Sequence, residues 1–204
     1  MLSIHNIKLG IEMEKSKLKV KVPSWDLRDF YINIDDPKIE EDFKKISVEI
    51  DKFQREFEGH IVNLNGKDLY QAIQSYEHIA ESLSFITSYA TLVYAHNMND
   101  KKGANFYQKT QERASDHSKK LIFFCLELNT IPDAQLKKLY AESEALKSYQ
   151  AWISDTRIYK SHQLDQKTET LFHELSVPSC NNWVRLYDET FASLTFSLRD
   201  KKYS

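Results

Sequence analysis

Residues 34–59 have the sequence IDDPKIEEDFKKISVEIDKFQREFEG, and this stretch decides the fold class. Its apolar residues recur every three or four positions, a period that places them along one side of an α-helix. They are Ile39, Phe43, Ile46, Ile50, Phe53 and Phe57. Asp36 suits the N-cap, Pro37 the first helical position and Gly59 the C-terminal stop. The stretch therefore predicts a helix with a seam that packs against a neighbouring helix.

Two more long helices are predicted downstream. Gly and Pro number only four each among 204 residues, so few residues interrupt helical structure. Residues 65–98 carry apolar side chains around more than one face, which indicates a central helix with neighbours on several sides. Residues 102–128 predict a third helix, with Tyr107, Ala114, Leu121, Cys125 and Leu128 facing inward. Short links between these helices make consecutive ones antiparallel.

Shorter helices are expected after residue 130, at about 133–144, 148–160, 165–176 and 179–193, before an extended LTFSL stretch. We therefore predict an all-α protein, an antiparallel up-and-down helical bundle followed by shorter helices. Its sections are an extended N-terminal segment (1–24) with a strand-like LKVKV, a bundle of long helices (25–130) and a section of shorter helices (131–204).

Composition argues against several classes of function. The formal net charge is −2, whereas nucleic-acid-binding proteins usually have a strong basic excess, and the one basic run, KSKLKVK (15–21), is typical of a solvated segment. No apolar run approaches the length of a membrane-spanning helix, and no signal peptide is evident. Cys125 and Cys180 form no disulfide framework or metal motif. We expect a cytoplasmic protein without nucleic-acid or membrane partners.

The stretch FHELSVP (172–178) contains the first half of the zinc-protease signature H-E-x-x-H. The position of the second histidine holds Val177, and Pro178 predicts that the helix ends there. Leu171, Phe172 and Leu175 define the apolar face of this helix, so His173 and Glu174 are expected in solvent. We interpret the pair as ordinary surface residues.

No other stretch predicts a catalytic or metal site. The closest histidines, His162 and His173, are eleven residues apart, so no helix carries two at metal-binding spacing. His78 and His117 each neighbour a carboxylate, as is common on charged helix surfaces, and Asp36 and Glu40 are explained by helix capping. There is no nucleophile elbow and no phosphate-binding glycine loop. The sequence thus predicts no catalytic residue, no metal ligand and no cofactor in this chain, and leaves substrate-binding residues unknown.

Four phrases in order nevertheless resemble one family. They are WDLRDFYINIDDPKIEEDFKKI (25–46), SFITSYATLVYAHNMND (84–100), LIFFCLELNTIPDAQL (121–136) and SHQLDQKTETLFHELSVPSCNNWVRLYDETFASLTF (161–196). Together they resemble the N-terminal region of the oligoendopeptidase F group of M3-family zinc metallopeptidases. The resemblance implies a mostly helical protein beside a deep cleft. It also implies that zinc and the H-E-x-x-H motif belong to a C-terminal catalytic lobe beyond Ser204, so no catalytic residue can be carried over.

The resemblance suggests that this chain forms the cleft wall and lid of an oligopeptide-cleaving zinc metalloendopeptidase. Alone the chain would be inactive, and its partners would be its own catalytic lobe and an oligopeptide substrate. The alternative is a non-enzymatic helical interaction module or a remnant of a split peptidase gene. The last stretch, TFSLRDKKYS (195–204), resembles the middle of a domain of this family, which favours a truncated chain over a finished domain. A truncated lobe should expose an apolar patch, whereas a module should have a polar surface. We also expect Trp183 to be packed, and Arg185 to pair with Asp188 or Glu189.

Overall fold

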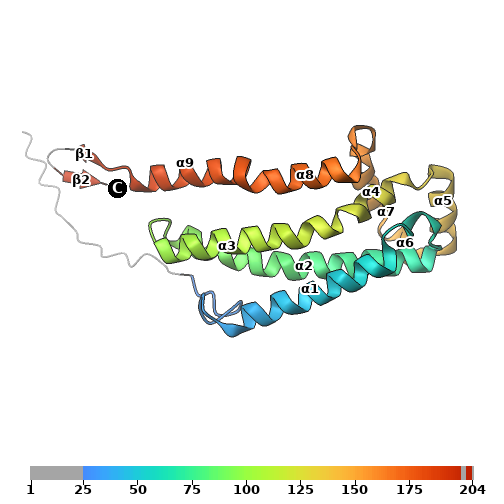
Figure 1. Cartoon of the computed structure of the whole chain (residues 1–204), viewed down its shortest axis with the longest axis horizontal. Coiled ribbons are helices and arrows are strands. Elements are labelled where there is room, and N and C mark those ends of the chain that lie inside the picture. Colours follow the sequence, from blue (N-terminus) through green and yellow to red (C-terminus); the bar gives the residue numbers. More distant parts are fainter. Residues whose placement is uncertain (1–24, 199–200, 204) are drawn as a thin grey trace, which may run out of the picture.

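The computed structural model describes residues 25–198 and 201–203, and helices dominate this part of the chain (Figure 1). Three long helices, α1 (Pro37–Phe57), α2 (Gly66–His96) and α3 (Lys101–Ser118), lie side by side. The links between them are short and each helix reverses the direction of the one before. The predicted all-α, up-and-down bundle is confirmed. The expected extended segment and strand in 1–24 lie outside the described residues.

Helix α1 begins and ends where its sequence predicts. The Asp36 side chain accepts a hydrogen bond from the Lys38 N–H at 2.9 Å, and Pro37 takes the first helical position. The helix ends at Phe57, and Gly59 follows with a positive φ of 79°. All six apolar residues of the predicted seam are buried, from Ile39 to Phe57. The seam is therefore a core surface.

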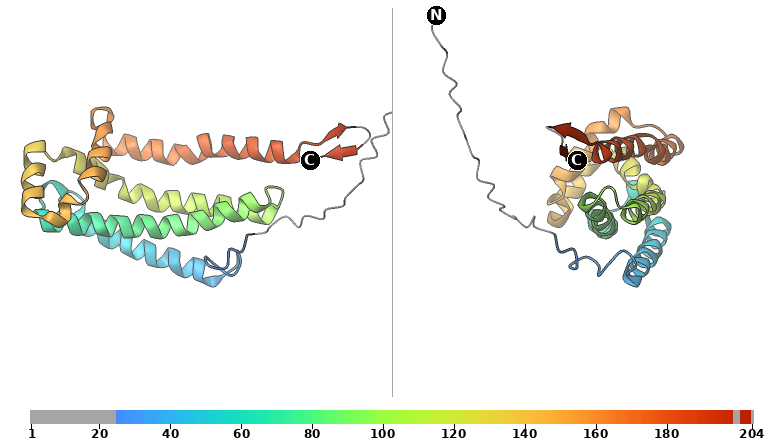
Figure 2. Two further views of the ribbon diagram at one scale, coloured as in Figure 1. Left: turned by 180° about the vertical axis from the view of Figure 1, so that it is seen from behind. Right: turned by 90° about the vertical axis from the view of Figure 1, so that its left-hand side faces the viewer.

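Helix α2 occupies the centre of the bundle. Asn65 caps it by accepting hydrogen bonds from the N–H groups of Lys67 and Asp68. It packs against both α1 and α3, and its first turns also contact the shorter helices that follow Thr130. The end-on view in Figure 2 shows the three long helices grouped together, and Arg113 of α3 pairs with Glu40 of α1 at 2.7 Å. Its buried residues lie on more than one face, as predicted.

The predicted third helix is not continuous. It divides into α3 and α4 (Ile122–Thr130), with a 3₁₀ turn, η2 (Lys119–Leu121), between them. A 3₁₀ turn has fewer residues per turn than an α-helix, so it shifts the phase of the side chains that follow it. Phe123 and Phe124 are adjacent in sequence, and both are buried. The prediction of one helix over 102–128 was wrong in this respect.

Shorter helices follow residue 130, as predicted, and the first of them lie at one end of the molecule (Figure 1). They are α5 (Asp133–Glu142), α6 (Glu144–Lys147) and α7 (Gln150–Arg157), followed by the 3₁₀ segment η3 (Ile158–His162). Arg157 of α7 links these shorter helices to the end of α4. Its guanidinium donates to the carbonyl oxygens of Leu128 at 2.9 Å and Ile131 at 2.8 Å, and to the Asp133 carboxylate. The Leu128 carbonyl oxygen also accepts from the Ile131 N–H at 3.3 Å, so Arg157 adds a second donor there and supplies one to the Ile131 carbonyl oxygen.

The chain then runs back along the bundle through α8 (Gln166–Ser176) and α9 (Asn182–Ser193). A π-helical segment, η4 (Val177–Asn181), joins the two helices, so the helical backbone passes through Pro178. Helix α8 ends at Ser176, before Pro178, as predicted, but the backbone stays helical because the wider π turn accommodates the interruption. Strands β1 (Phe196–Leu198) and β2 (Lys201–Tyr203) then pair antiparallel, with Phe196 opposite Tyr203. The extended LTFSL stretch is confirmed.

The hydrophobic core lies wholly within the part of the chain that precedes α8. Its buried apolar side chains run from Tyr31 to Ile153, and no residue of α8, η4 or α9 is buried. A helix with a wide apolar stripe normally buries that stripe against a neighbour. Helices α8 and α9 therefore lack a core of their own within the described residues.

Candidate functional site

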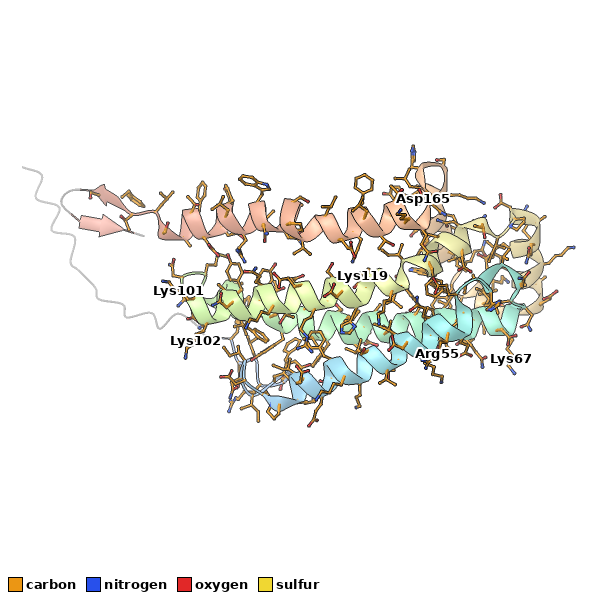
Figure 3. All side chains as sticks on the ribbon, in the orientation of Figure 1. Arg55, Lys67, Lys101, Lys102, Lys119 and Asp165 are labelled. Carbon is orange, nitrogen blue, oxygen red and sulfur yellow. The ribbon has the colours of Figure 1, made fainter. Side chains whose placement is uncertain are left out.

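Glu174 is exposed, as predicted, but His173 does not lie in solvent. His173 is half-buried on the side of α8 that faces the bundle, where its Nε2 lies 3.3 Å from the Ser115 carbonyl oxygen. The Glu174 carboxylate pairs with Lys119 Nζ at 3.0 Å. Figure 3 shows Lys119 between the bundle and α8. The H-E pair therefore helps to hold α8 on the bundle.

The donor groups around His173 do not fit zinc. Structural and catalytic zinc sites need at least three protein ligands converging on one point. No group of three or more His, Cys, Asp or Glu residues converges in this way within the described ranges. Val177 stands where a second histidine would complete the motif. We therefore assign no metal-dependent step to these residues.

The apolar side chains of α8 point away from the bundle, contrary to prediction. Leu171, Phe172 and Leu175 are 52%, 59% and 47% exposed. The periodicity correctly groups them on one face, but that face has no neighbour among the described residues. The polar side of the helix packs inward instead.

The same inversion continues along α9. Trp183, expected in the packing, is 70% exposed, and the side chains on its side of the helix are about half exposed. We call these exposed side chains of α8 and α9, together with the residue that follows α9, the outward face. It consists of Leu171, Phe172, Leu175, Trp183, Val184, Leu186, Tyr187, Phe191 and Leu194. Figure 3 shows side chains projecting from α8 and α9 on the side away from the bundle.

The outward face is almost free of charge. Between Leu171 and Ser197, Glu174 is the only exposed charged residue, and it is paired with Lys119. Solvent-facing helix surfaces normally carry many charged residues. Contiguous apolar patches of this kind mark interaction sites. The outward face is the strongest candidate functional surface of the described chain.

The opposite side of α9 makes polar contacts. Arg185 forms the predicted ion pair with Glu189 at 3.4 Å, and it also donates to the Gln108 side chain at 2.5 Å. The Asn99 amide donates to the Ala192 carbonyl oxygen at 3.3 Å. The attachment of α9 to the bundle is thus hydrophilic.

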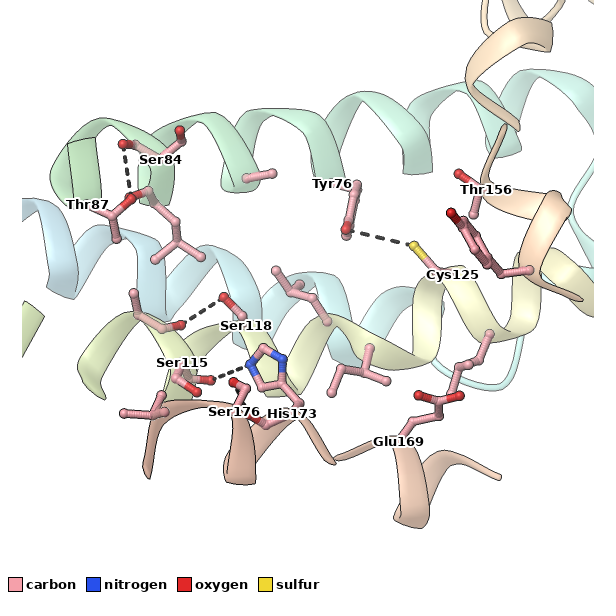
Figure 4. Close-up of a pocket in the computed structure, with 18 of the residues that line it drawn as sticks. Tyr76, Ser84, Thr87, Ser115, Ser118, Cys125, Thr156, Glu169, His173 and Ser176 are labelled. Atoms are coloured by element: carbon pink, nitrogen blue, oxygen red, sulfur yellow. Dashed lines mark hydrogen bonds between the residues drawn. The ribbon is translucent and has the colours of Figure 1, made fainter. Parts of the chain in front are cut away.

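A cavity of about 810 Å³ separates α8 and η4 from the bundle. Helices α2, α3, α4 and the segment from α7 to η3 form its other walls. Figure 4 shows His173 and Ser176 of α8 beside Ser115 and Ser118 of α3, with Tyr76 and Cys125 further along. Sequence reasoning missed this cavity, because its walls come from segments far apart in the chain.

The remaining titratable candidates have structural roles. His117 stacks on the Phe43 ring, and burial lowers the pKa of its imidazole. It therefore differs from the charged-surface residue that was expected. Cys125 is half-buried, its Sγ lies 3.8 Å from the Tyr76 hydroxyl, and burial raises the pKa of its thiol. A thiol with a raised pKa is a poor nucleophile.

These observations define a class, a helical scaffold with an exposed apolar face and no assembled metal centre among the described residues. Residues 127–196 match the family model described as Oligopeptidase F, which covers the N-terminal region of that peptidase family. This match confirms the recognition made from the sequence phrases over residues 127–196, which hold the last phrase and part of the one before it. No curated protein and no solved structure matched the chain. None of the described helices is long and apolar enough to span a bilayer.

Proposed function

We propose that this chain is the N-terminal cleft-wall and lid region of an oligopeptide-cleaving zinc metalloendopeptidase. The zinc and the groups that activate water belong to a separate catalytic lobe, and the chain alone does not cleave peptides. Closure of such a region over a cleft excludes water and folded proteins, which restricts substrates to short peptides. The cytoplasmic location expected from the sequence is part of this proposal.

The observation that supports the proposal is the position of the outward face. Every residue of this face lies within 127–196, the segment that matches the family. Fully burying a large apolar side chain contributes about 1.5–3 kcal/mol, so completing the burial of nine half-exposed ones would contribute roughly 10 kcal/mol before the entropy cost of docking. A lobe docked there would give α8 and α9 the hydrophobic neighbour that they lack.

The second candidate is a non-enzymatic helical interaction module. A module that functions without a docked lobe should have a finished polar surface, and the outward face has almost no charge. This favours a permanently docked lobe over the module. A module whose partner is an unrelated protein is one outcome of the test below.

The test mixes this chain with a polypeptide that is encoded by the same genome, carries H-E-x-x-H and matches the catalytic part of the same family. We expect the two to form a complex that cleaves a fluorogenic oligopeptide when zinc is present, while the chain alone with zinc shows no cleavage. Trp183→Glu should abolish the complex, because it places a charge on the outward face. Val48→Glu, at a 67% exposed position of α1, is the matched control.

Two results would contradict the proposal. One is metal-dependent hydrolysis by the purified 204-residue chain that persists in repeated preparations. The other is an active catalytic polypeptide whose activity and assembly are unaffected by this chain. The second result, with a different partner bound through the outward face, would establish the interaction module.

A further inference from the structure

Helices α8 and α9 meet the bundle through a polar surface, which is the reverse of ordinary helix packing. We call α8, η4 and α9 together (residues 166–193) the strap. Among the half-buried residues of the strap, Val177 and Ala192 alone are apolar. No side chain of the strap belongs to the hydrophobic core, whose last member along the described chain is Ile153. The strap therefore lies on the bundle without the apolar burial that normally fixes a helix in place.

A few polar contacts hold the strap in its observed position. Two involve charged side chains: Lys119 Nζ lies 3.0 Å from the Glu174 carboxylate, and Arg185 donates to the Gln108 side chain at 2.5 Å. We call these two contacts the latch. The Lys119 and Glu174 side chains are 33% and 47% exposed. Separating such groups is inexpensive, because water solvates the charges and replaces the hydrogen bonds.

The cavity described above lies beneath the strap and weakens its packing further. Its volume is about 810 Å³, and its walls include His173 and Val177 of the strap and Tyr76 and Cys125 of the bundle (Figure 4). Protein interiors contain few voids larger than a water molecule, and atoms that line a void lose their dispersion contacts. The strap is thus held at its edges and is not packed along this part of its length.

A short extended segment joins the strap to the rest of the chain. On one side, Gln163 is fixed to α4, because its side chain accepts from the Asn129 amide at 2.9 Å and donates to the Leu126 carbonyl oxygen at 3.2 Å. On the other side, Asp165 caps α8. Both Gln163 and Asp165 have extended backbone, with ψ of 133° and 155°, and Leu164 lies between them. Rotation about the backbone of Leu164 moves α8 while both anchors stay formed.

We propose that the strap swings as one unit on Leu164, between the closed position seen here and an open position that exposes the cavity. Opening breaks the latch and leaves the core intact, so it requires much less free energy than unfolding of the bundle. In the open position, molecules larger than water reach the cavity walls. Motions of this type occur on the microsecond-to-millisecond scale. The proposal concerns this chain alone and does not depend on a catalytic lobe.

Distances between spin labels test the swing in the full chain. One label is attached to the exposed native Cys180 of the strap and the other to Lys109→Cys, an exposed position of α3, with Cys125→Ala to prevent a third label. We expect two populations, one at the closed distance and one longer. Labels at Val48→Cys and Lys109→Cys, both on the bundle, are the control and should give a single narrow distribution once Cys180 is also replaced. A single narrow distribution for the strap pair, in the parent and the latch variant alike, would overturn the proposal.

The latch variant combines Lys119→Met with Arg185→Met and should raise the ratio of open to closed molecules by roughly tenfold. Lys120→Met is the matched control. Lys120 is the next residue and is 37% exposed, but it pairs at 2.8 Å with Asp51 of α1, within the bundle. It should leave the ratio unchanged. Equal ratios in the latch variant and in Lys120→Met would refute the assignment of the latch.

Modification of Cys125 by a bulky thiol reagent gives a second readout. Cys125 is half-buried in the cavity wall, whereas Cys180 is exposed and serves as the reference in each sample. The latch variant should modify Cys125 roughly tenfold faster than Lys120→Met does. Hydrogen exchange at the buried amides of Ile50 and Ile86 should be unchanged, which separates the swing from unfolding of the bundle. Equal acceleration at these core amides, or no acceleration at Cys125, would overturn the proposal.

Discussion

Arg157 should be the most important single polar residue for stability, because one side chain links three elements. Its side chain is 10% exposed, and its guanidinium donates to the carbonyl oxygens of Leu128 and Ile131 and to the carboxylate of Asp133. These contacts hold α7 against the end of α4 and the start of α5. Replacing Arg157 with Met keeps most of the apolar volume and removes all the donors.

The size of the effect follows from the number of bonds lost. Each hydrogen bond from a charged donor contributes about 1.5–3 kcal/mol, and the two carbonyls would be left without this donor. We expect Arg157→Met to lower the free energy of unfolding by about 3 kcal/mol. Arg157→Lys should recover only part of this, because an ammonium group cannot reproduce the planar fork of donors.

Urea unfolding followed by circular dichroism measures this difference. Arg28→Met is the matched control, because Arg28 pairs with Asp26 at 2.5 Å while its side chain is 75% exposed. It should leave stability almost unchanged, because an exposed ion pair contributes little. A loss below about 1 kcal/mol for Arg157→Met, or full recovery by Arg157→Lys, would refute this reasoning.

Three more predictions concern the core and the caps. Phe53→Ala should cost about 3–5 kcal/mol in urea unfolding, because Phe53 is 2% exposed among the rings of Phe57, Phe123 and Phe124; a cost under about 1 kcal/mol would mean that the seam is not core. Tyr31→Phe should lower the free energy of unfolding by about 1 kcal/mol, because the Tyr31 hydroxyl donates to Asp42 at 2.9 Å. Tyr94→Phe should be neutral or stabilising, because the buried Tyr94 hydroxyl has no partner among the described residues. Equal losses of stability in the two variants would contradict this. The N–H groups of Ile32 and Lys38 donate to the Asp36 carboxylate and lower its pKa below the ordinary 3.8. The carboxylate therefore stabilises the fold fully above its unfolded pKa, and this stabilisation is lost as pH falls through its folded pKa. Urea midpoints from pH 7 to pH 2 should fall less steeply in Asp36→Asn than in the parent chain, and parallel curves would contradict this.

The sequence predicted the bundle well where local signals agree with each other. Asp36, Pro37 and Gly59 mark both ends of α1, and the spacing from Ile39 to Phe57 identifies the buried side. The wide apolar surface of residues 65–98 similarly predicted that α2 is a central helix. Each of these signals is encoded within a few turns of chain, so no knowledge of distant contacts is needed.

The candidate site was harder to predict, because periodicity groups side chains but does not identify their neighbour. Leu171 and Trp183 lie on an apolar face, yet the bundle contacts the opposite side through Glu174 and Arg185. The packing of that side depends on Lys119 and Gln108, which lie more than fifty residues away in the sequence. A local pattern contains no information about such partners.

The π segment Val177–Asn181 also fixes the alignment of α8 and α9. Each residue of an α-helix advances the side chains by about 100°, so an uninterrupted α-helix from Leu171 to Leu194 would spiral its apolar stripe around the axis. The wider turn absorbs about one extra residue and brings the two halves of the stripe back into phase. Converting this segment to a regular α-helix while keeping all of its residues would rotate everything beyond it by roughly a quarter turn. The tryptophan and the arginine of α9 would then leave their present sides, although no residue of the stripe itself had been altered.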